Sequence, residues 1–453
     1  MSTSHVEKDI GIEGFASTHL GIGGSIKHSP EDFTVEELLL DGSRVKSTYD
    51  PPSRSEEKDR YLICLLVKQD WDTITAIHII ARQLGIHEER IQAMGLKDKR
   101  AVTAQYISIE NIKMIELKRI TTKGLTVQPL RYSPNMMFPQ MLYGNAFKIV
   151  IRQIPLSHSA ITNRMNAMLD SLRSLGGFPN FFGHQRFGVT RPITHKVGRA
   201  LAEGDLKQAV LVFLANYSAW EHPQARLARI RLSESSDFKT ALEEFPKNLA
   251  YERLLLSYLQ KHPEDFTGAL RELPIQLRRL FLQAYQSYLF NRFLSERAKR
   301  GIPIEKPQKG DYVLKADSNR LPSRSYVKAT SRNLETLRRS VKKGEMFVAL
   351  PLIGFRQSPS DGLQGEIEAS VLQRENITQQ HFLTPSLPEV SAGGGLRATV
   401  ARVQNLSFEM PMNDEQNPAK RKLGLGFTLH RGCYATVFLR ELMKPHNLAE
   451  AGF

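Results

Sequence analysis

The chain has 453 residues, of which 41% are hydrophobic and 24% are charged. These fractions resemble those of ordinary globular proteins, so they exclude a wholly disordered, collagen-like or disulfide-scaffold protein. The formal net charge of +15 at pH 7 is typical of proteins that bind a polyanion, above all nucleic acid; a basic surface without such a partner is the alternative.

The cellular setting follows from the cysteines and from the distribution of apolar residues. Cys64 and Cys433 both lie in apolar runs, which predicts buried free thiols and a reducing compartment. No apolar run reaches the roughly 18 residues that a membrane span needs, and the first residues lack a signal-peptide pattern. We expect a cytoplasmic protein without a membrane partner.

The first predicted elements precede residue 70. Residues 1–20 are polar and aperiodic, which predicts a loose start. Phe33 and Val35 alternate with polar residues as in a strand. The polar stretch 43–60 predicts an exposed loop, and YLICLLVKQ after it a buried strand.

A helix is predicted next, from Asp72 as its N-cap to Leu84, with Gly85 at its end. HEERIQAM predicts a second short helix. The segment after it ends in a strand in which Ile107 and Ile109 share a face.

AFKIVIRQI predicts a further strand. Phe147, Ile149 and Ile151 face one side, whereas Lys148 and Arg152 face the other. A helix over about 159–175 follows, and its methionine-rich stripe predicts a buried core.

The sequence changes character between about 205 and 390, where it is rich in charge and in helical periodicity, including the helix LRRLFLQAYQSYLFNRFLSERAKR. LRATVARVQNLSFEM then predicts a strand and CYATVFLRELMKP a terminal helix. We therefore predict one mixed α/β domain over residues 1–204 and 391–453, interrupted by a helix-rich insertion over 205–390.

The common cofactor motifs are missing from the sequence. It contains no GxxxxGK[ST] loop, GxSxG elbow, HExxH or CxxC, and its Gly21–Gly24 cluster does not complete GxGxxG. We predict neither a metal nor a small-molecule cofactor.

Three polar clusters remain as candidate sites. In GLKDKRAVTAQ, Asp98 lies among Lys97, Lys99 and Arg100. Neighbouring cations favour the anionic form of an aspartate, which suits a nucleophile or a stabiliser of positive charge. Asp98 could equally cap a turn.

The other two clusters are FPNFFGHQRFG and IKHSPEDFTVEE. The first combines aromatic, amide and guanidinium groups, as the recognition of an unstacked base requires, although Phe181 and Phe182 could form a core pair. In the second, Lys27 precedes a proline turn and could be a solvated surface charge. Together with the charge, the clusters indicate a carboxylate enzyme acting on RNA without fixing the reaction.

These segments resemble a known family. GLKDKRAVTAQ and PNFFGHQRFG resemble the signature segments of the TruD family, the tRNA pseudouridine synthase D enzymes. The likeness extends to IKHSPEDFTVEE, YGNAFKIVIR, LQAYQSYLFNRFLSER, GDYVL and GCYATVFLRELMK, in the family's order between residues 26 and 444. The chain length resembles that of archaeal members.

The resemblance implies a fold and a reaction. The fold is a pseudouridine synthase domain, with a mixed antiparallel sheet flanked by helices, interrupted by a TRUD insertion domain. The reaction isomerises uridine to pseudouridine in tRNA, at uridine 13, without a cofactor. A tRNA-binding folding chaperone with secondary or no catalysis, or another RNA modification such as methyl transfer, is the alternative. We expect a monomer.

The resemblance also assigns roles to residues. Asp98 would be the catalytic aspartate, attacking C1′ or removing a proton from C2′, and Lys27 would pair with it. Phe182 would stack on the target base, and Asn180 would bond near the aspartate or the nucleotide.

Phe33 and Glu37 match the remaining positions of the first motif and are expected near the active site, with Glu37 ordering the lysine or the base. We expect phosphate contacts from a group of basic residues: Lys99, Arg100, Lys148, Arg152, Arg191 and Lys196. The run NPAKRKLG is expected to be a loop, either solvated or in contact with RNA.

Overall fold

A computed structural model describes residues 3–45 and 58–453. The chain divides into two compact units. The sheet unit comprises residues 19–171 and 401–452, and the helical unit comprises residues 1–18, 172–400 and 453. The predicted domain boundaries at 204/205 and 390/391 follow a different division and stay a prediction.

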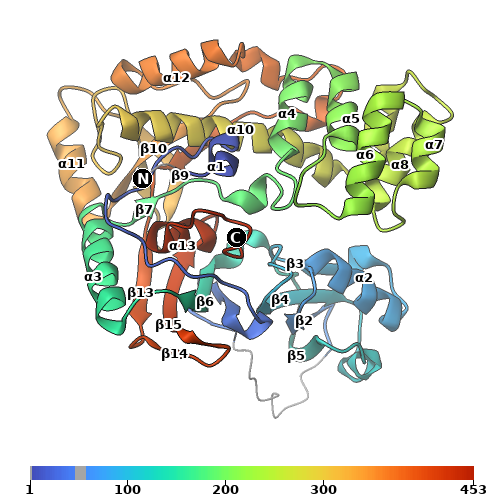
Figure 1. The fold of residues 1–453 in the computed structure, drawn as a ribbon, viewed down its shortest axis with the longest axis horizontal. Coiled ribbons are helices and arrows are strands. Elements are labelled where there is room, and N and C mark those ends of the chain that lie inside the picture. Colours follow the sequence, from blue (N-terminus) through green and yellow to red (C-terminus); the bar gives the residue numbers. More distant parts are fainter. Residues whose placement is uncertain (1–2, 46–57) are drawn as a thin grey trace. The chain divides into compact units, whose positions relative to one another are not determined.

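A mixed nine-stranded sheet forms the centre of the sheet unit (Figure 1). Its main path runs β13-β15-β6-β1-β4-β2-β5, while β3 pairs with β4 and β14 with β15. The strands are β1 (Phe33–Leu39), β2 (Tyr61–Gln69), β3 (Ile91–Ala93), β4 (Val102–Glu110), β5 (Leu125–Ser133), β6 (Leu142–Ile154), β13 (Val403–Phe408), β14 (Met412–Asp414) and β15 (Asn417–His430). A mixed sheet with helices confirms the predicted fold class.

The parallel pairing of β1 with β4 is the feature that positions the site. Thr34 lies opposite Val102 and Val35 opposite Thr103. Because parallel strands start at the same edge of a sheet, the segments that precede β1 and β4 lie side by side. On its other edge, β1 pairs antiparallel with β6.

Helix α2 (Thr73–Leu84) covers part of this sheet. As predicted, the Asp72 side chain caps it by accepting a hydrogen bond from the Thr75 N–H, and Gly85 ends it with a φ of 70°. Its apolar residues pack on β2 and β4 through a buried cluster that includes Ile80, Leu66 and Ile107. The predicted strands of this region are confirmed.

The C-terminal strand β15 pairs with β6 over most of its length. The Phe147 and Phe427 rings stack with centroids 5.1 Å apart, and Phe427 meets Phe438 of α13 (Ala435–Met443) edge-on at 4.8 Å. The expectation of a loop at NPAKRKLG is wrong, because residues 417–424 belong to β15 and pair with β14 and β6.

Helices dominate the helical unit, as the sequence between 205 and 390 predicts. They are α1 (His5–Asp9), α4 (Thr194–Glu203), α5 (Leu206–Ala215), α6 (Pro223–Ser235), α7 (Phe238–Glu244), α8 (Ala250–Leu259), α9 (Phe266–Glu272), α10 (Ile275–Lys299), α11 (Leu334–Lys343) and α12 (Gly362–Arg374). Helix α3 (His158–Ser174) crosses from one unit into the other. Its methionines, Met165 and Met168, are buried as predicted.

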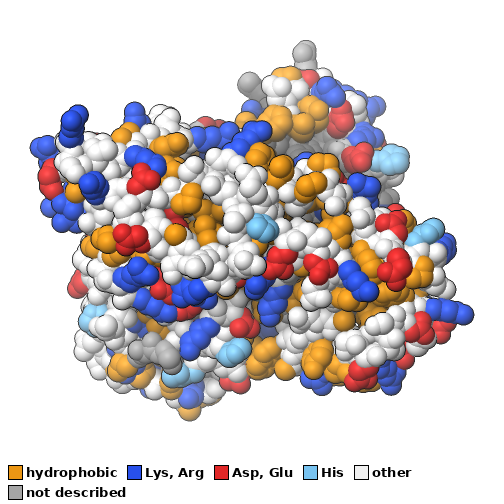
Figure 2. Space-filling view, turned by 90° about the horizontal axis from the view of Figure 1, so that it is seen from above, with side chains coloured by type: hydrophobic (Ala, Val, Ile, Leu, Met, Phe, Trp, Pro, Cys, Tyr) orange, Lys and Arg blue, Asp and Glu red, His pale blue; other side chains and the backbone are white. Residues whose placement is uncertain are grey.

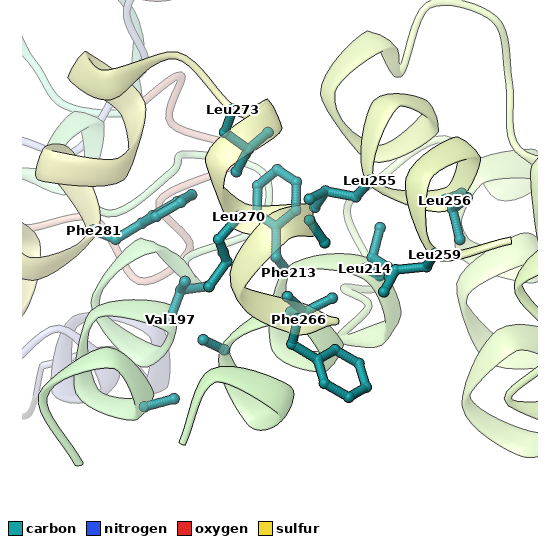
Figure 3. Close-up of a cluster of buried hydrophobic side chains, with 14 of the residues drawn as sticks. Val197, Phe213, Leu214, Leu255, Leu256, Leu259, Phe266, Leu270, Leu273 and Phe281 are labelled. Atoms are coloured by element: carbon teal, nitrogen blue, oxygen red, sulfur yellow. The ribbon is translucent and has the colours of Figure 1, made fainter. Parts of the chain in front are cut away.

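A buried apolar cluster joins α4, α5, α8, α9 and α10 (Figure 3). Val197, Phe213, Leu255 and Leu270 belong to it, together with Phe281 of α10. The unit also holds a four-stranded sheet, β11-β10-β8-β9, that the sequence did not reveal. The strands outside the nine-stranded sheet are β7 (Phe178–Pro179), β8 (Tyr312–Ala316), β9 (Pro322–Lys328), β10 (Met346–Leu352), β11 (Gly395–Ala398) and β12 (Val400–Ala401).

Two further expectations are wrong. HEERIQAM forms a single 3-10 turn over Glu88–Arg90 and then β3, because Ile91 pairs opposite Ile109 of β4. The start of the chain is not loose: a capping box at Ser4 begins α1, and Ile10 and Ile12 are fully buried.

Part of the predicted loop at 43–60 lies outside the described residues, at 46–57. Among the described residues, no helix is both long and apolar enough to cross a bilayer.

Candidate active site

Asp98 and Lys27 form an ion pair in the sheet unit. Asp98 lies in the loop between β3 and β4, and its Oδ2 is 3.0 Å from Nζ of Lys27, which precedes β1. Their side chains are 28% and 12% exposed, so solvent reaches the pair. The parallel pairing of β1 and β4 explains why two residues distant in sequence meet here.

Lys27 is held by its neighbours. Its backbone has a φ of 60°, a conformation that costs a non-glycine residue about 1 kcal/mol or more. Its Nζ lies 4.7 Å from the centre of the Phe33 ring, within the range of a cation–π contact. Phe33 is buried, and its ring meets that of Phe147. The Arg100 guanidinium donates to the carbonyl oxygen of His28, next to Lys27.

Glu37 contacts a different lysine. Its side chain is fully buried, with Oε1 2.9 Å from Nζ of Lys97 and Oε2 accepting a hydrogen bond from the Tyr106 N–H. The Lys97 ammonium also donates to Oδ1 of Asn145 at 2.6 Å. The side chains of these two neighbours in sequence therefore have different partners: Lys97 contacts Glu37 and Asn145, whereas Asp98 contacts Lys27.

Lys68, near the end of β2, contacts the main chain of the Asp98 loop. It is fully buried, and its Nζ donates to the carbonyl oxygens of Trp71 at 2.7 Å and of Asp98 at 2.8 Å. Burial lowers the pKa of Lys68 to about 8, although the charges of Asp98 and Asp72 oppose the decrease.

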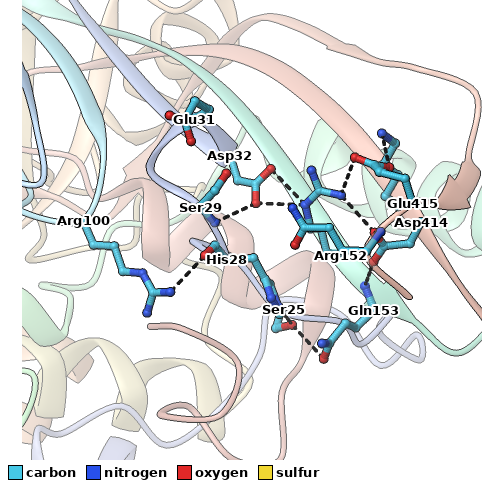
Figure 4. A network of polar contacts seen from close by, with 12 residues as sticks. Ser25, His28, Ser29, Glu31, Asp32, Arg100, Arg152, Gln153, Asp414 and Glu415 are labelled. Carbon is cyan, nitrogen blue, oxygen red and sulfur yellow. Dashed lines mark hydrogen bonds and ion pairs between the residues drawn. The ribbon is translucent and has the colours of Figure 1, made fainter. Parts of the chain in front are cut away.

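A buried network anchors the segment that carries Lys27 (Figure 4). The Arg152 guanidinium contacts Asp32, Asp414 and Glu415, each at about 2.9 Å. The backbones of Arg152 and Ser25 exchange two hydrogen bonds. Acidic side chains thus cover the Arg152 guanidinium.

The aromatic and amide candidates lie in the helical unit. Asn180 is buried; its Nδ2 donates to the carbonyl oxygen of Ala398 at 2.9 Å, and its Oδ1 accepts from Arg397 at 2.7 Å. The Arg397 guanidinium also lies 4.0 Å from the centre of the Phe182 ring. Phe182 is 8% exposed and meets Phe290 of α10 edge-on at 5.6 Å.

The same loop is fixed to α10. The Phe182 N–H donates to Oδ1 of Asn291, whose Nδ2 donates back to the Phe182 carbonyl oxygen. Arg186 donates to Ser287 and Gln283, so it also holds the loop against α10.

The basic group divides into surface and buried members. Lys99, Arg100 and Lys148 are exposed, and Lys196 is half-buried; Figure 2 shows Lys and Arg side chains spread over the viewed face among acidic and hydrophobic ones. Internal ion pairs engage Arg152 and Arg191, so the exposed members of the group are better placed for phosphate contacts. Arg191 bonds Glu252 at 3.1 Å, and its pKa is lowered to about 10 by burial and by Arg229.

Comparison with known proteins decides the family. The family model for tRNA pseudouridine synthase D (TruD) matches residues 9–442. The chain belongs to the TruD family.

Relatives and a solved structure agree with this TruD assignment. Proteins of Methanosarcina acetivorans and Methanosarcina mazei, each named "Probable tRNA pseudouridine synthase D", are 36% identical over 450 residues, which is 99% of this chain and 99% of theirs. A crystal structure of a TruD protein from Methanosarcina mazei has a TM-score of 0.80 and 35% identity, and covers 98% of this chain and 99% of that one. The predicted family is confirmed.

Two residues that contact the candidate residues of this TruD protein, Lys68 and Arg397, lie outside the sequence motifs. Lys68 is a single charge in an otherwise apolar strand, a signal visible in YLICLLVKQ. Arg397 carried no signal, because it lies 217 positions from Asn180 in the chain. In the described parts of the chain, no group of three or more His, Cys, Asp or Glu side chains is arranged to hold a metal ion.

Proposed function

We propose that this protein isomerises uridine 13 of tRNA to pseudouridine in the cytoplasm, with Asp98 as its catalytic aspartate. Membership of the TruD family supports the broader statement: the chain is a tRNA pseudouridine synthase, an isomerase. The observation that carries the assignment of the aspartate is the partly exposed Asp98–Lys27 pair.

The chemistry suits a carboxylate. In the isomerisation the N1–C1′ bond breaks and a C5–C1′ bond forms; the proton on C5 leaves and N1 regains one, so the formula is unchanged. Asp98 acts either by attacking C1′, where positive charge develops as in glycoside cleavage, or by removing the C2′ proton. The Lys27 ammonium places a positive charge 3.0 Å from the carboxylate that acts in both routes.

Supporting residues complete the proposal. Phe33 positions Lys27 through its ring, and Glu37 holds Lys97 and thereby the loop that carries Asp98. Phe182 stacks on the target uracil, and Asn180 orders the loop that presents this ring. Extraction of a base costs a few kcal/mol, of which one aromatic contact returns roughly 1–3 kcal/mol; phosphate contacts of the exposed lysines supply the rest.

The decisive experiment compares the wild type with Asp98→Asn on a tRNA transcript. Pseudouridine is mapped by carbodiimide modification and primer extension, and affinity is measured by filter binding. We expect the wild type to modify position 13, and the variant to form no pseudouridine while its Kd stays within about threefold, because Asp98 acts on the transition state rather than in docking. Asp59→Asn, which changes an exposed aspartate of the same unit, is the control and keeps activity.

The alternative, a tRNA folding chaperone, makes the opposite prediction. Its function survives Asp98→Asn, and the wild type forms no pseudouridine. Modification at another uridine would overturn the assignment of position 13 alone.

A further inference from the structure

We propose that Lys68 is a positioning residue that fixes the loop carrying Asp98 through hydrogen bonds to its backbone. The proposal rests on the proposed function, in which Asp98 is the catalytic group. Lys68 does not touch the Asp98–Lys27 contact; it acts through the main chain on which Asp98 stands.

Lys68 places a charged group in the interior of the sheet unit. An ammonium group is expensive to remove from water unless its hydrogen bonds are replaced, yet the Lys68 side chain is fully buried in β2. Lys68 lies opposite Thr103 of β4 on one side and Leu125 of β5 on the other. A lysine buried between two strands therefore needs compensating acceptors.

The acceptors come from the main chain and connect two segments. They are main-chain carbonyl oxygens from two segments: Trp71, just before α2, and Asp98, with the Lys97 oxygen at 3.4 Å. One cation thus ties the segment after β2 to the loop before β4. A second contact links the loop to the start of α2: the Lys97 N–H donates to Oγ1 of Thr73 at 3.0 Å.

The charge of Lys68 strengthens these hydrogen bonds. The charged groups that act on Lys68 are Asp98 and Lys97 from the loop and Asp72 from the start of α2. The pKa of Lys68 near 8 means that it is mostly charged at neutral pH, so its bonds to the carbonyls are of the stronger, charge-assisted kind. The ammonium also adds positive electrostatic potential at the Asp98 carboxylate.

The functional consequence is accurate placement of the Asp98 carboxylate. A small misplacement of a catalytic group can lower the rate by about 100-fold. Without the Lys68 ammonium, Asp98 keeps Lys27 as its partner, but the main chain that orients its carboxylate loses its buried support. The effect then falls on turnover and not on tRNA docking.

The test uses Lys68→Met in the full chain, which keeps the length of the side chain and removes the ammonium. We expect kcat to fall about 10- to 100-fold while KM for tRNA stays within about threefold. Amide hydrogen exchange should increase in residues 94–101 and stay unchanged in β2 and β4. Lys118→Met, at an exposed lysine of the same unit, should match the wild type in every measurement.

Three outcomes would overturn the proposal: a kcat within twofold of the wild type, a raised KM with unchanged kcat, or faster exchange throughout β2 and β4, which would mean that Lys68 supports the whole unit. If the wild type forms no pseudouridine, the proposed function fails, and the exchange measurement alone still decides whether Lys68 orders the loop.

Discussion

Replacing Arg152 by methionine tests whether buried charges hold the segment that carries Lys27. The Arg152 side chain is 8% exposed, and its partners Asp32 and Asp414 are 3% and 0% exposed. Arg152→Met keeps much of the side-chain volume but leaves two buried carboxylates without a cation. Breaking a buried ion pair in this way costs about 3–5 kcal/mol. Glu415 is 55% exposed and adds little.

The assay is urea unfolding of the full chain combined with amide hydrogen exchange. We expect the free energy of opening to fall by about 3–5 kcal/mol in peptides that cover residues 25–32 and 412–416. Arg60→Met is the matched control: Arg60 pairs with Glu110 at the end of β4, but its side chain is 63% exposed, so its loss should cost far less than that of Arg152.

The pH dependence sharpens this test. Burial disfavours the Asp414 carboxylate, but hydrogen bonds from Gln153, Gln416 and Arg152 outweigh it and lower the pKa of Asp414. A carboxylate with a lowered pKa stabilises the fold above its unfolded pKa, and this stability is lost as the pH falls through the folded pKa. The difference between the wild type and Arg152→Met should therefore shrink in acid. Equal costs for the Arg152 and Arg60 variants at neutral pH would refute the reasoning.

Two further predictions concern the helical unit. Phe182→Ala should lower kcat more than it weakens tRNA binding, since a lost stacking contact is worth roughly 1–3 kcal/mol. Phe182→Leu is the control for side-chain volume. Equal losses in the single-turnover rate and in the filter-binding affinity would count against stacking. Burial raises the pKa of Glu368 to about 7 despite hydrogen bonds from Ser360 and Gln364. Between about pH 4.5 and pH 7, the Glu368 carboxyl group therefore holds a proton in the folded state that it does not hold in the unfolded chain. The contribution of Glu368 to stability should thus grow as the pH falls from 8 to 5, and Glu368→Gln should lack this part of the pH dependence in urea titrations; identical profiles would contradict the assignment.

Local patterns predicted the elements whose causes are local. Helix α2 begins at an aspartate cap and ends at Gly85, and both signals are visible in the sequence. HEERIQAM misled because its helical spacing competes with β3, whose pairing with β4 is a tertiary contact. The basic run in β15 misled for the same reason, since charge alone suggested a solvated loop.

The candidate site divides in the same way. Asp98, Lys27 and Asn180 were identified by resemblance, because their motifs are contiguous. No pattern indicated that Arg152 would be enclosed by acids brought from positions 32 and 414 of the chain. Similarly, the spacing in GLKDKRAVTAQ could not tell which lysine faces Asp98, since that depends on the partner strand.

The central position of β1 has a consequence for how the protein matures. Lys27 reaches Asp98 because β1 docks between β6 and β4, two strands that follow it at a distance in the chain. A chain in which this strand is not docked lacks the Asp98–Lys27 ion pair. Formation of the Asp98–Lys27 pair is thereby coupled to completion of the sheet.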